Sequence, residues 1–215
     1  KLDERIEMQE AKVEKLKAMK QAYLHEMFPA EGETVPKRRF RGFSGEWKEN
    51  KLGDITSINT GDSDVKDADE DGEYPFFIRS EIVQRSNKYT FDGEAILIPG
   101  EGRLGEIFHY IKGKFDYHQR VYKISDFDEK VDGKFIYFSM HKSFKDHAMK
   151  YTVKSTVNSL RLPMLTEYEV KIPSLKEQAK IGKFFKNLDE KIAMQEAKVE
   201  KLKAMKSAYL NEMFV

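Results

Sequence analysis

Residues 188–214, LDEKIAMQEAKVEKLKAMKSAYLNEMF, repeat residues 2–28, LDERIEMQEAKVEKLKAMKQAYLHEMF, with 23 identities in 27 aligned positions. The two copies are 186 residues apart, far more than the tens of residues that separate the units of a solenoid. The repeat therefore frames one central segment of the chain and does not form an array.

Each copy has the apolar spacing of a helix that packs against a partner. Neither copy contains proline or glycine, and the apolar positions alternate four and three residues apart, as in a coiled coil. Isolated helices of this length are marginal in water, so each copy needs a partner. The predicted packing residues are Leu2, Ile6, Val13, Leu16, Tyr23 and Met27 in the first copy, and Leu188, Ile192, Val199, Leu202, Tyr209 and Met213 in the second.

The second helix has a recognisable start. Pro173 precedes Ser174 and Glu177, which have the spacing of a capping box. The helix is predicted from about 175 to 213, close to 60 Å at about 1.5 Å per residue, of which the duplicated part is about 40 Å. The first copy has no counterpart of residues 174–186 and the chain begins at Lys1, so we expect a piece of a longer chain. A compact central segment would make the two helices antiparallel, with that segment at one end of a stalk.

The segment between the copies is predicted to be one α+β domain. Prolines and a glycine mark residues 29–46 as a linker, and Trp47 opens a domain over 47–173. A helix is predicted near 133–149, and strands with mostly antiparallel or mixed pairing are predicted near 51–58, 74–78, 95–98, 106–111, 116–124 and 168–172.

The composition excludes several classes of protein. The 215 residues include no cysteine, which excludes a disulfide scaffold and thiolate zinc sites, and no apolar run of about 18 residues that could span a membrane. A cytoplasmic location is expected. The net charge of +1 provides no global basic surplus for nucleic acid, although a neutral sum can hide a basic face.

A glycine-rich stretch, GEGRLG at 100–105, matches GxGxxG but lacks the context of a dinucleotide site. That site needs a helix at the third glycine, whereas EIFHYI at 106–111 followed by Lys112, Gly113 and Lys114 is typical of a strand and a turn. A hairpin with Glu101 and Arg103 at its tip is predicted instead. The histidines and carboxylates match no metal or acid/base motif, so no catalytic residue, metal ligand or cofactor site is assigned to the chain.

Several loops carry side chains that suit DNA. Arginine can read guanine bidentately, glutamine and asparagine can read adenine, and serine, threonine and lysine suit phosphates. The candidate DNA-binding residues are Arg79, Ser80, Arg85, Arg103, Tyr117, His118, Gln119, Arg120, Lys154, Ser155, Thr156, Asn158 and Arg161. Residue types alone do not distinguish such loops from an ordinary solvated surface.

Two stretches carry a resemblance to a known family: PSLKEQAKIGKFFKNLDEKI, from Pro173 to Ile192, and FRGFSGEW, from Phe40 to Trp47. Together with ILIPGEGRLG and DYHQRVYKI in the central segment, they resemble the specificity subunit of type I restriction-modification enzymes over nearly the whole chain. In that family two target recognition domains alternate with two conserved antiparallel helices, and each domain reads half of a split DNA site.

The resemblance implies that this chain is the C-terminal half of such a subunit: a truncated spacer helix 1 at 1–28, a linker at 29–46, a target recognition domain at 47–173 and spacer helix 2 at 174–215. It implies double-stranded DNA, methyltransferase (modification) subunits and a motor/nuclease (restriction) subunit as partners. Catalysis, AdoMet, ATP and Mg would belong to those partners, so the chain itself would not be an enzyme. A stalk of about 40 Å would set two readers about one DNA turn, about 34 to 36 Å, apart.

Two alternatives remain open. A half-length specificity protein could self-associate through the spacer helices and read a symmetric split site, since twofold proteins match palindromic targets. A coiled-coil assembly protein, whose middle domain contacts only protein, would bind no DNA.

Overall fold

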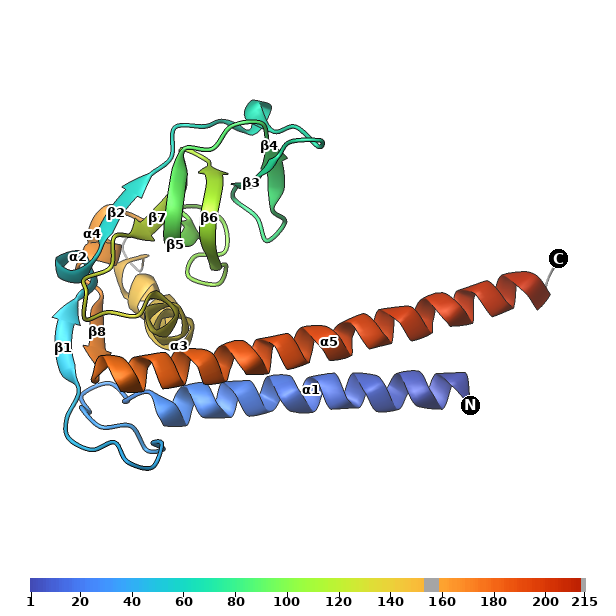
Figure 1. Ribbon diagram of the computed structural model, residues 1–215, viewed down its shortest axis with the longest axis horizontal. Coiled ribbons are helices and arrows are strands. Elements are labelled where there is room, and N and C mark those ends of the chain that lie inside the picture. Colours follow the sequence, from blue (N-terminus) through green and yellow to red (C-terminus); the bar gives the residue numbers. More distant parts are fainter. Residues whose placement is uncertain (153–158, 214–215) are drawn as a thin grey trace.

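Two long antiparallel helices form a stalk that carries an α+β domain at one end. The computed structural model describes residues 1–152 and 159–213, and its stalk consists of α1 (Leu2–Met27) and α5 (Leu175–Met213). Figure 1 shows the two helices side by side, with the sheet above one end of α5 and both termini at the other end. The 39 residues of α5 correspond to about 58 Å. The predicted fold class, an α+β domain flanked by two long antiparallel helices, is confirmed.

The predicted seam between the helices is buried over most of its length. Ile6, Val13, Met27, Leu188, Ile192 and Val199 are buried, and Leu2, Leu16, Tyr23 and Leu202 are partly buried. The prediction is wrong for Tyr209, which is 55% exposed. Asp3 of α1 already pairs with Lys206, so Tyr209 lies past the described start of α1 and has no helix beside it. The side chain of Met213 lies outside the described part of the structure.

The ion pairs between the helices obey the symmetry of the repeat. Each residue of the first copy has its equivalent 186 positions later in the second copy. Replacing both members of an ion pair by their equivalents gives another ion pair that is also present. The two matched sets are Lys17 with Glu196 (2.9 Å) and Lys203 with Glu10 (2.8 Å), then Lys20 with Asp189 and Lys206 with Asp3 (both 2.5 Å). The stalk is therefore pseudo-twofold symmetric at the level of side-chain contacts.

The domain is built around a six-stranded sheet in the order β2-β7-β5-β6-β3-β4. Its strands are β2 (Ser57–Thr60), β3 (Tyr74–Phe77), β4 (Gln84–Ser86), β5 (Phe91–Pro99), β6 (His109–Tyr117) and β7 (Val121–Ser125). The β3–β6 pair is parallel and the other pairs are antiparallel. The helical elements are α2 (Leu52–Ile55), a 3₁₀ turn at Val65–Asp67, α3 (Gly133–Thr152) and α4 (Leu162–Thr166).

A separate two-stranded ribbon joins the beginning and end of the domain. In this ribbon β1 (Lys48–Lys51) pairs antiparallel with β8 (Glu169–Ile172), with Lys48 opposite Ile172. The chain therefore enters and leaves the domain at neighbouring points, next to the start of α5.

The central strand β5 has both faces buried, because side chains alternate across a strand. Ile96 and Ile98 belong to the main core, together with α3 and the domain end of the stalk. Ala95 and Leu97 face a second, smaller core formed by Phe77, Phe115, Tyr117 and Val121. The fully buried Phe185 of α5 lies in the main core, so the stalk is packed into the domain and is not a loose attachment.

Some predicted strands are shifted. Residues 51–58 divide into β1, the single turn α2 and β2, and the predicted turn at 112–114 lies inside β6. The chain reverses at 118–120 instead, where the amide of Val121 donates to the carbonyl of His118. Gly93 of β5 is the register partner of Gly113 of β6, and glycine pairs in a sheet accompany bends. The exposed lysines beside Gly113 made this stretch of strand look like a turn.

The linker is locked to the start of α5 by a buried ion pair. The Nε and Nη2 atoms of Arg39 each donate to the carboxylate of Glu177, at 2.7 Å, and Glu177 is 1% exposed. The same guanidinium donates to the carbonyls of Ser44 and Gly45. The capping-box prediction had assigned the Glu177 carboxylate to the amide of Ser174, whereas its hydrogen bonds here come from the linker.

None of the helices in residues 1–152 and 159–213 combines the length and apolar composition that crossing a bilayer requires.

Candidate nucleic-acid interface

Three loops of the domain bring arginines and glutamates together. The arginine–glutamate cluster comprises Arg79, Glu81, Glu101, Arg103, Glu106 and Arg120. These residues come from the loops that follow β3, β5 and β6. Backbone hydrogen bonds fix the arrangement, because the amide of Gly100 donates to the carbonyl of Arg120 and the amide of Leu160 donates to the carbonyl of Gly100, both at 2.8 Å.

Glu101 is the acceptor that joins two of the arginines. Arg79 donates to Glu101 Oε2 at 2.8 Å, and Arg120 donates to the other carboxylate oxygen. Hydrogen bonds from Arg79 and from Arg120 lower the pKa of Glu101. Both arginines remain about half exposed, so their guanidinium groups are oriented but still reachable from solvent.

Arg103 lies in the second part of the cluster. It pairs with Glu81 and lies 3.9 Å from Glu106, which in turn accepts from Lys145 of α3 at 2.6 Å. The hydrogen bond from Lys145 lowers the pKa of Glu106. A β-carbon on Gly105 would lie 2.8 Å from the Cα of Lys145, and Gly105 has a φ of 66°, so the loop requires glycine there. The glycines of GEGRLG thus shape the loop after β5, and the predicted hairpin is confirmed.

Two predicted DNA-binding residues are buried, which corrects their assignment. The hydroxyl of Tyr117 donates to Asn59 at 2.9 Å, and His118 is 2% exposed with Nδ1 accepting the amide of Arg120 at 3.0 Å. Desolvation lowers the pKa of His118. The sheet closes on itself here, since a β-carbon on Gly61, just after β2, would lie 1.9 Å from the carbonyl oxygen of Tyr117. Tyr117 and His118 therefore hold the sheet together and offer no side-chain surface to DNA.

Three further candidates make local contacts. Arg85 donates to the carbonyls of Gly72 (2.8 Å) and Glu73 (2.6 Å), so it anchors the acidic loop and does not point freely outward. The hydroxyl of Ser80 bonds within its own turn to Ile82, and Gln119 donates to Asp64 at 3.3 Å. Arg161 is exposed just before α4. Lys154, Ser155, Thr156 and Asn158 lie outside the described residues.

Ile82 was not among the residues predicted from the sequence. It is 74% exposed and lies in the loop between β3 and β4, three residues after Arg79. An apolar tip beside arginines suits contact with a thymine methyl or an unstacked base step. The signal was the IVQ segment directly after Arg79-Ser80-Glu81, an apolar pair in an otherwise polar loop.

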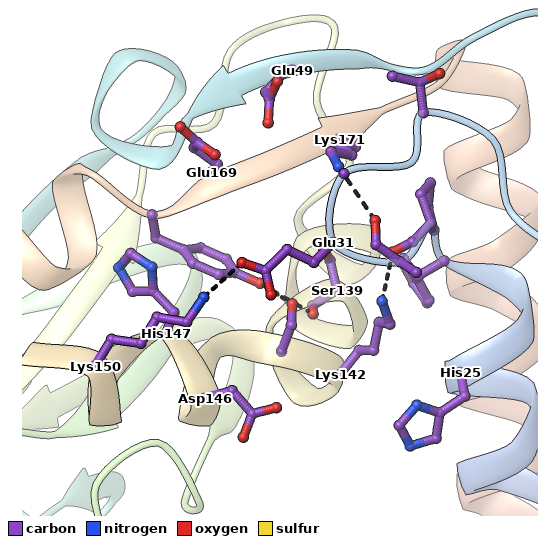
Figure 2. Close-up of a pocket in the computed structure, with 17 residues that line it drawn as sticks. His25, Glu31, Glu49, Ser139, Lys142, Asp146, His147, Lys150, Glu169 and Lys171 are labelled. Carbon is purple, nitrogen blue, oxygen red and sulfur yellow. Dashed lines mark hydrogen bonds and ion pairs between the residues drawn. The ribbon is translucent and has the colours of Figure 1, made fainter.

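A hollow of about 510 Å³ lies where the linker crosses α3 and β8 (Figure 2). Its lysines are already bonded to the linker: Lys142 donates to the carbonyl of Pro29 at 2.5 Å, Lys171 to that of Glu33 at 2.7 Å, and Lys150 to the carboxylate of Glu31 at 2.7 Å. Deeper in the hollow, His147 bonds to the carbonyl of Met164 and Ser143 bonds to the hydroxyl of Tyr168. These groups clamp the linker, and their arrangement does not resemble a catalytic centre. Within the described residues, histidines and carboxylates form no group of three that could hold a metal ion.

Comparison with known proteins points to one family. Residues 44–204 match the family model described as the type I restriction modification DNA specificity domain. The specificity subunit of the type I restriction enzyme EcoDI of Escherichia coli is 32% identical over 160 residues, which are 73% of this chain and 34% of that protein.

Solved structures have the same fold. The S subunit of a type I restriction-modification system from M. genitalium superposes with a TM-score of 0.75 at 17% identity, covering 96% of this chain and 56% of that one. The HsdS subunit of Thermoanaerobacter tengcongensis superposes with a TM-score of 0.63 at 15% identity, covering 98% of this chain and 53% of that one. The chain thus spans about a third of the curated relative and just over half of the solved chains. From the match over residues 44–204, the chain belongs to the family of type I restriction-modification DNA specificity domains.

Proposed function

We propose that the chain reads one half of a split DNA site as part of a type I specificity subunit, with the stalk setting the distance to a second reader. One observation carries this proposal: the two helices of the stalk are related by a pseudo-twofold axis, down to their ion pairs, and the recognition domain sits at one end of this symmetric stalk. At the domain end Tyr23 packs edge-on against Phe184 at 5.2 Å and Leu24 is 1% exposed. Their counterparts at the far end, Tyr209 and Leu210, are 55% and 44% exposed.

The pseudo-twofold symmetry makes the far end of the stalk equivalent to the end that carries the domain. A helix pair that packs into a domain at one end can pack into a related domain at the equivalent end. A second recognition domain, related to the first by a half turn, would cover Tyr209 and Leu210. The two readers would then lie on a shared stalk whose duplicated part measures about 40 Å, close to one turn of DNA.

Within the domain, the arginine–glutamate cluster is the proposed reading surface. Arg79 and Arg120 present guanidinium groups that are held by a carboxylate and remain exposed, a state that suits bidentate recognition of guanine. The other predicted contacts that stay part of the proposal are Arg103, Ser80, Gln119 and Arg161, with Lys154, Ser155, Thr156 and Asn158 undescribed. The cluster contains as many carboxylates as arginines, so it suits base edges better than it suits the phosphate backbone.

The proposed partners are duplex DNA, methyltransferase subunits docked on the helices, and a motor/nuclease subunit in a complete restriction complex. The chain would contribute recognition, whereas AdoMet, ATP and Mg would be bound by those partners. The pseudo-twofold symmetry of the stalk also favours a second arrangement, in which another copy of the chain supplies the second domain. Light scattering separates the two arrangements, because self-association predicts a dimer of the isolated chain.

The proposal is tested by replacing Arg103 and Arg120 with alanine in the complex with methyltransferase subunits. Because a good bidentate contact discriminates by about 1 to 3 kcal/mol, each change should weaken binding to the selected target by roughly tenfold or more, with little effect on unrelated duplex. Arg41→Ala, at an exposed linker residue far from the cluster, is the matched control. Equal target affinity in all variants would exclude these arginines from the reading surface. Absence of DNA binding by the unmodified complex would favour a pure assembly protein.

A further inference from the structure

One face of the stalk carries cations and methionines but no carboxylates. Along α1 this basic–methionine face consists of Arg5, Met8, Lys12, Lys15 and Met19, and along α5 of Lys191, Met194, Lys198, Lys201 and Met205. The residues in each set are three and four apart, so they form one stripe on each helix. The two stripes are equivalent under the repeat and differ only in arginine against lysine at the first position.

The two stripes meet on one side of the stalk. A shallow hollow of about 630 Å³ is lined by Arg5, Met8 and Lys12 from α1 and by Lys198, Lys201 and Met205 from α5. A second hollow, of about 370 Å³, is lined by Glu10, Glu14, Lys17, Glu196, Glu200 and Lys203, and is therefore on a different side. The face continues toward the domain into Lys180 and Phe184, where Phe40 of the linker covers it.

The lysines on the two sides of the stalk differ in whether they form ion pairs. The ion pairs of Lys17 and Lys203 with Glu196 and Glu10 lie on the side with carboxylates. On the basic–methionine face the six cations are all exposed, and in the part of the chain that the structure describes none of them has a carboxylate within 4.0 Å. The six charges are therefore not needed to hold the helices together.

We propose that the basic–methionine face binds the phosphate backbone of the duplex between the two half-sites. The inference rests on the proposed function, since it needs DNA beside the stalk. Lysine makes point-charge contacts to phosphates without reading bases, which is what an unread spacer requires. The acidic side of the stalk would repel the same backbone.

The symmetry and length of the face match a duplex. The backbone of a DNA duplex has a twofold axis at each base pair, so two stripes related by a half turn can each contact one strand. From residue 5 to residue 19 the stripe extends about 21 Å along α1, the rise of about six base pairs at about 3.4 Å each. Because a strand winds about half a turn over that length, each stripe contacts the phosphates only where a strand passes it. Methionine is uncharged and flexible, so the four methionines between the cations can adapt to sugar and backbone.

The experiment uses the full chain in complex with its methyltransferase partners and a duplex selected by that complex from a randomised library. In the variant K12Q/K198Q/K201Q each change removes one cation from the centre of the face. Because each phosphate contact contributes about 0.9 to the slope of log affinity against log salt, the slope over about 50 to 300 mM salt should become shallower by about 2 to 3. The loss should be the same when the spacer bases are changed.

Lys186→Gln is the matched control, because Lys186 is an exposed lysine of α5 that lies outside the face, pairs with Glu190 at 3.3 Å and lines a separate hollow beside Tyr110 and Tyr137. Thermal unfolding of the isolated chain checks that the triple variant folds. An unchanged salt slope overturns the inference. The inference is also overturned if the triple variant assembles more weakly with the methyltransferase but binds DNA normally once the methyltransferase is saturating. The face would then bind protein. An unmodified complex that selects no duplex would overturn the proposed function, and this inference with it.

Discussion

The side-chain amide of Gln9 donates a hydrogen bond to the side-chain oxygen of Gln195, with Nε2 and Oε1 2.7 Å apart. The two residues occupy the same position in the two copies of the repeat, so the bond joins equivalents across the pseudo-twofold arrangement. Gln195 is buried in the seam. A buried amide pair of this kind favours one register of the helices over registers in which each amide would face an apolar residue.

Replacing one glutamine should therefore cost more than replacing both. Gln195→Ala leaves the amide of Gln9 without its partner in the seam, and the free energy of unfolding should fall by about 1 to 3 kcal/mol. The double variant Q9L/Q195L should recover most of that loss, because neither helix then buries an unpaired amide. Urea unfolding of the three proteins measures the differences. Equal losses in the single and double variants would show that the hydrogen bond has no specific role.

The Arg39–Glu177 pair predicts a large effect from a single truncation. Glu177→Ala leaves the partly exposed guanidinium of Arg39 without its carboxylate, and the expected destabilisation is about 1.5 to 3 kcal/mol. Glu26→Ala removes the partner of Arg38 in an exposed pair and should cost less than about 1 kcal/mol. Thermal or urea unfolding gives the comparison, and similar values for both variants would contradict the proposed lock between linker and α5.

His141 predicts how stability changes with pH. Desolvation lowers its pKa from 6.5 to about 4, with a smaller contribution from the charge of Lys20, and its ring packs against Phe108, Tyr137 and Phe138. Below about pH 6.5 the unfolded chain binds a proton that the folded chain does not, so stability should decline as the pH falls toward 4, by about 3 kcal/mol in total.

The variant His141→Phe should flatten part of this profile, because Phe cannot be protonated and the unpaired Nε2 disappears. Some slope should remain, since burial also lowers the pKa of His118 and of His147. Melting temperatures at about pH 7 and about pH 4.5 give the measurement. A pH profile identical to that of the unmodified protein would exclude His141 as a contributor.

Adding the same methyl group at two glycines should lower the free energy of unfolding by different amounts. At Gly61 a β-carbon would collide with the carbonyl of Tyr117, so Gly61→Ala should force the edge of the sheet apart and cost several kcal/mol. Gly102 has a φ of 88° but nothing within 4 Å of its added β-carbon, so Gly102→Ala should cost only about 1 to 2 kcal/mol of backbone strain. Comparable losses at the two positions would show that the sheet does not close tightly at Tyr117.

Replacing Glu101 should reduce discrimination between target and unrelated DNA rather than abolish DNA binding. In Glu101→Gln the shared acceptor of Arg79 and Arg120 loses its charge, so both guanidinium groups are less firmly oriented and freer to contact phosphates. Affinity for unrelated duplex should rise by severalfold while the ratio of target to unrelated binding falls roughly tenfold. Glu129→Gln, at an exposed residue before α3, is the control for the same change in net charge. A preserved ratio would mean that Glu101 does not position the arginines.

The stalk was predictable because its information is local and repeated. The apolar spacing at Ile6, Val13, Ile192 and Val199 gives the seam directly, and antiparallel packing follows from chain connectivity. The exposed state of Tyr209 could not be predicted in this way, since spacing cannot tell where the partner helix stops.

The sheet was harder to predict. The predicted turn around Gly113 lies within a paired strand, and Tyr117 and His118 are buried because β6 closes against Gly61, far away in sequence. The candidate interface was predictable in residue type at Arg79, Arg103 and Arg120, but their shared carboxylate partners depend on three loops meeting. Such a meeting is a property of the fold, and local sequence does not encode it.

The ribbon of β1 and β8 has a consequence for how the molecule can vary. Because Lys48 lies opposite Ile172, the chain enters and leaves the domain at adjacent points, and the domain then packs on the stalk through the core around Phe185. A different domain with the same two terminal strands and an apolar face that covers Phe185 could be grafted at this ribbon while α1 and α5 keep their register, since inserted domains are tolerated where their ends are close together. The ribbon therefore separates the part of the chain that can diversify from the part whose dimensions must stay constant.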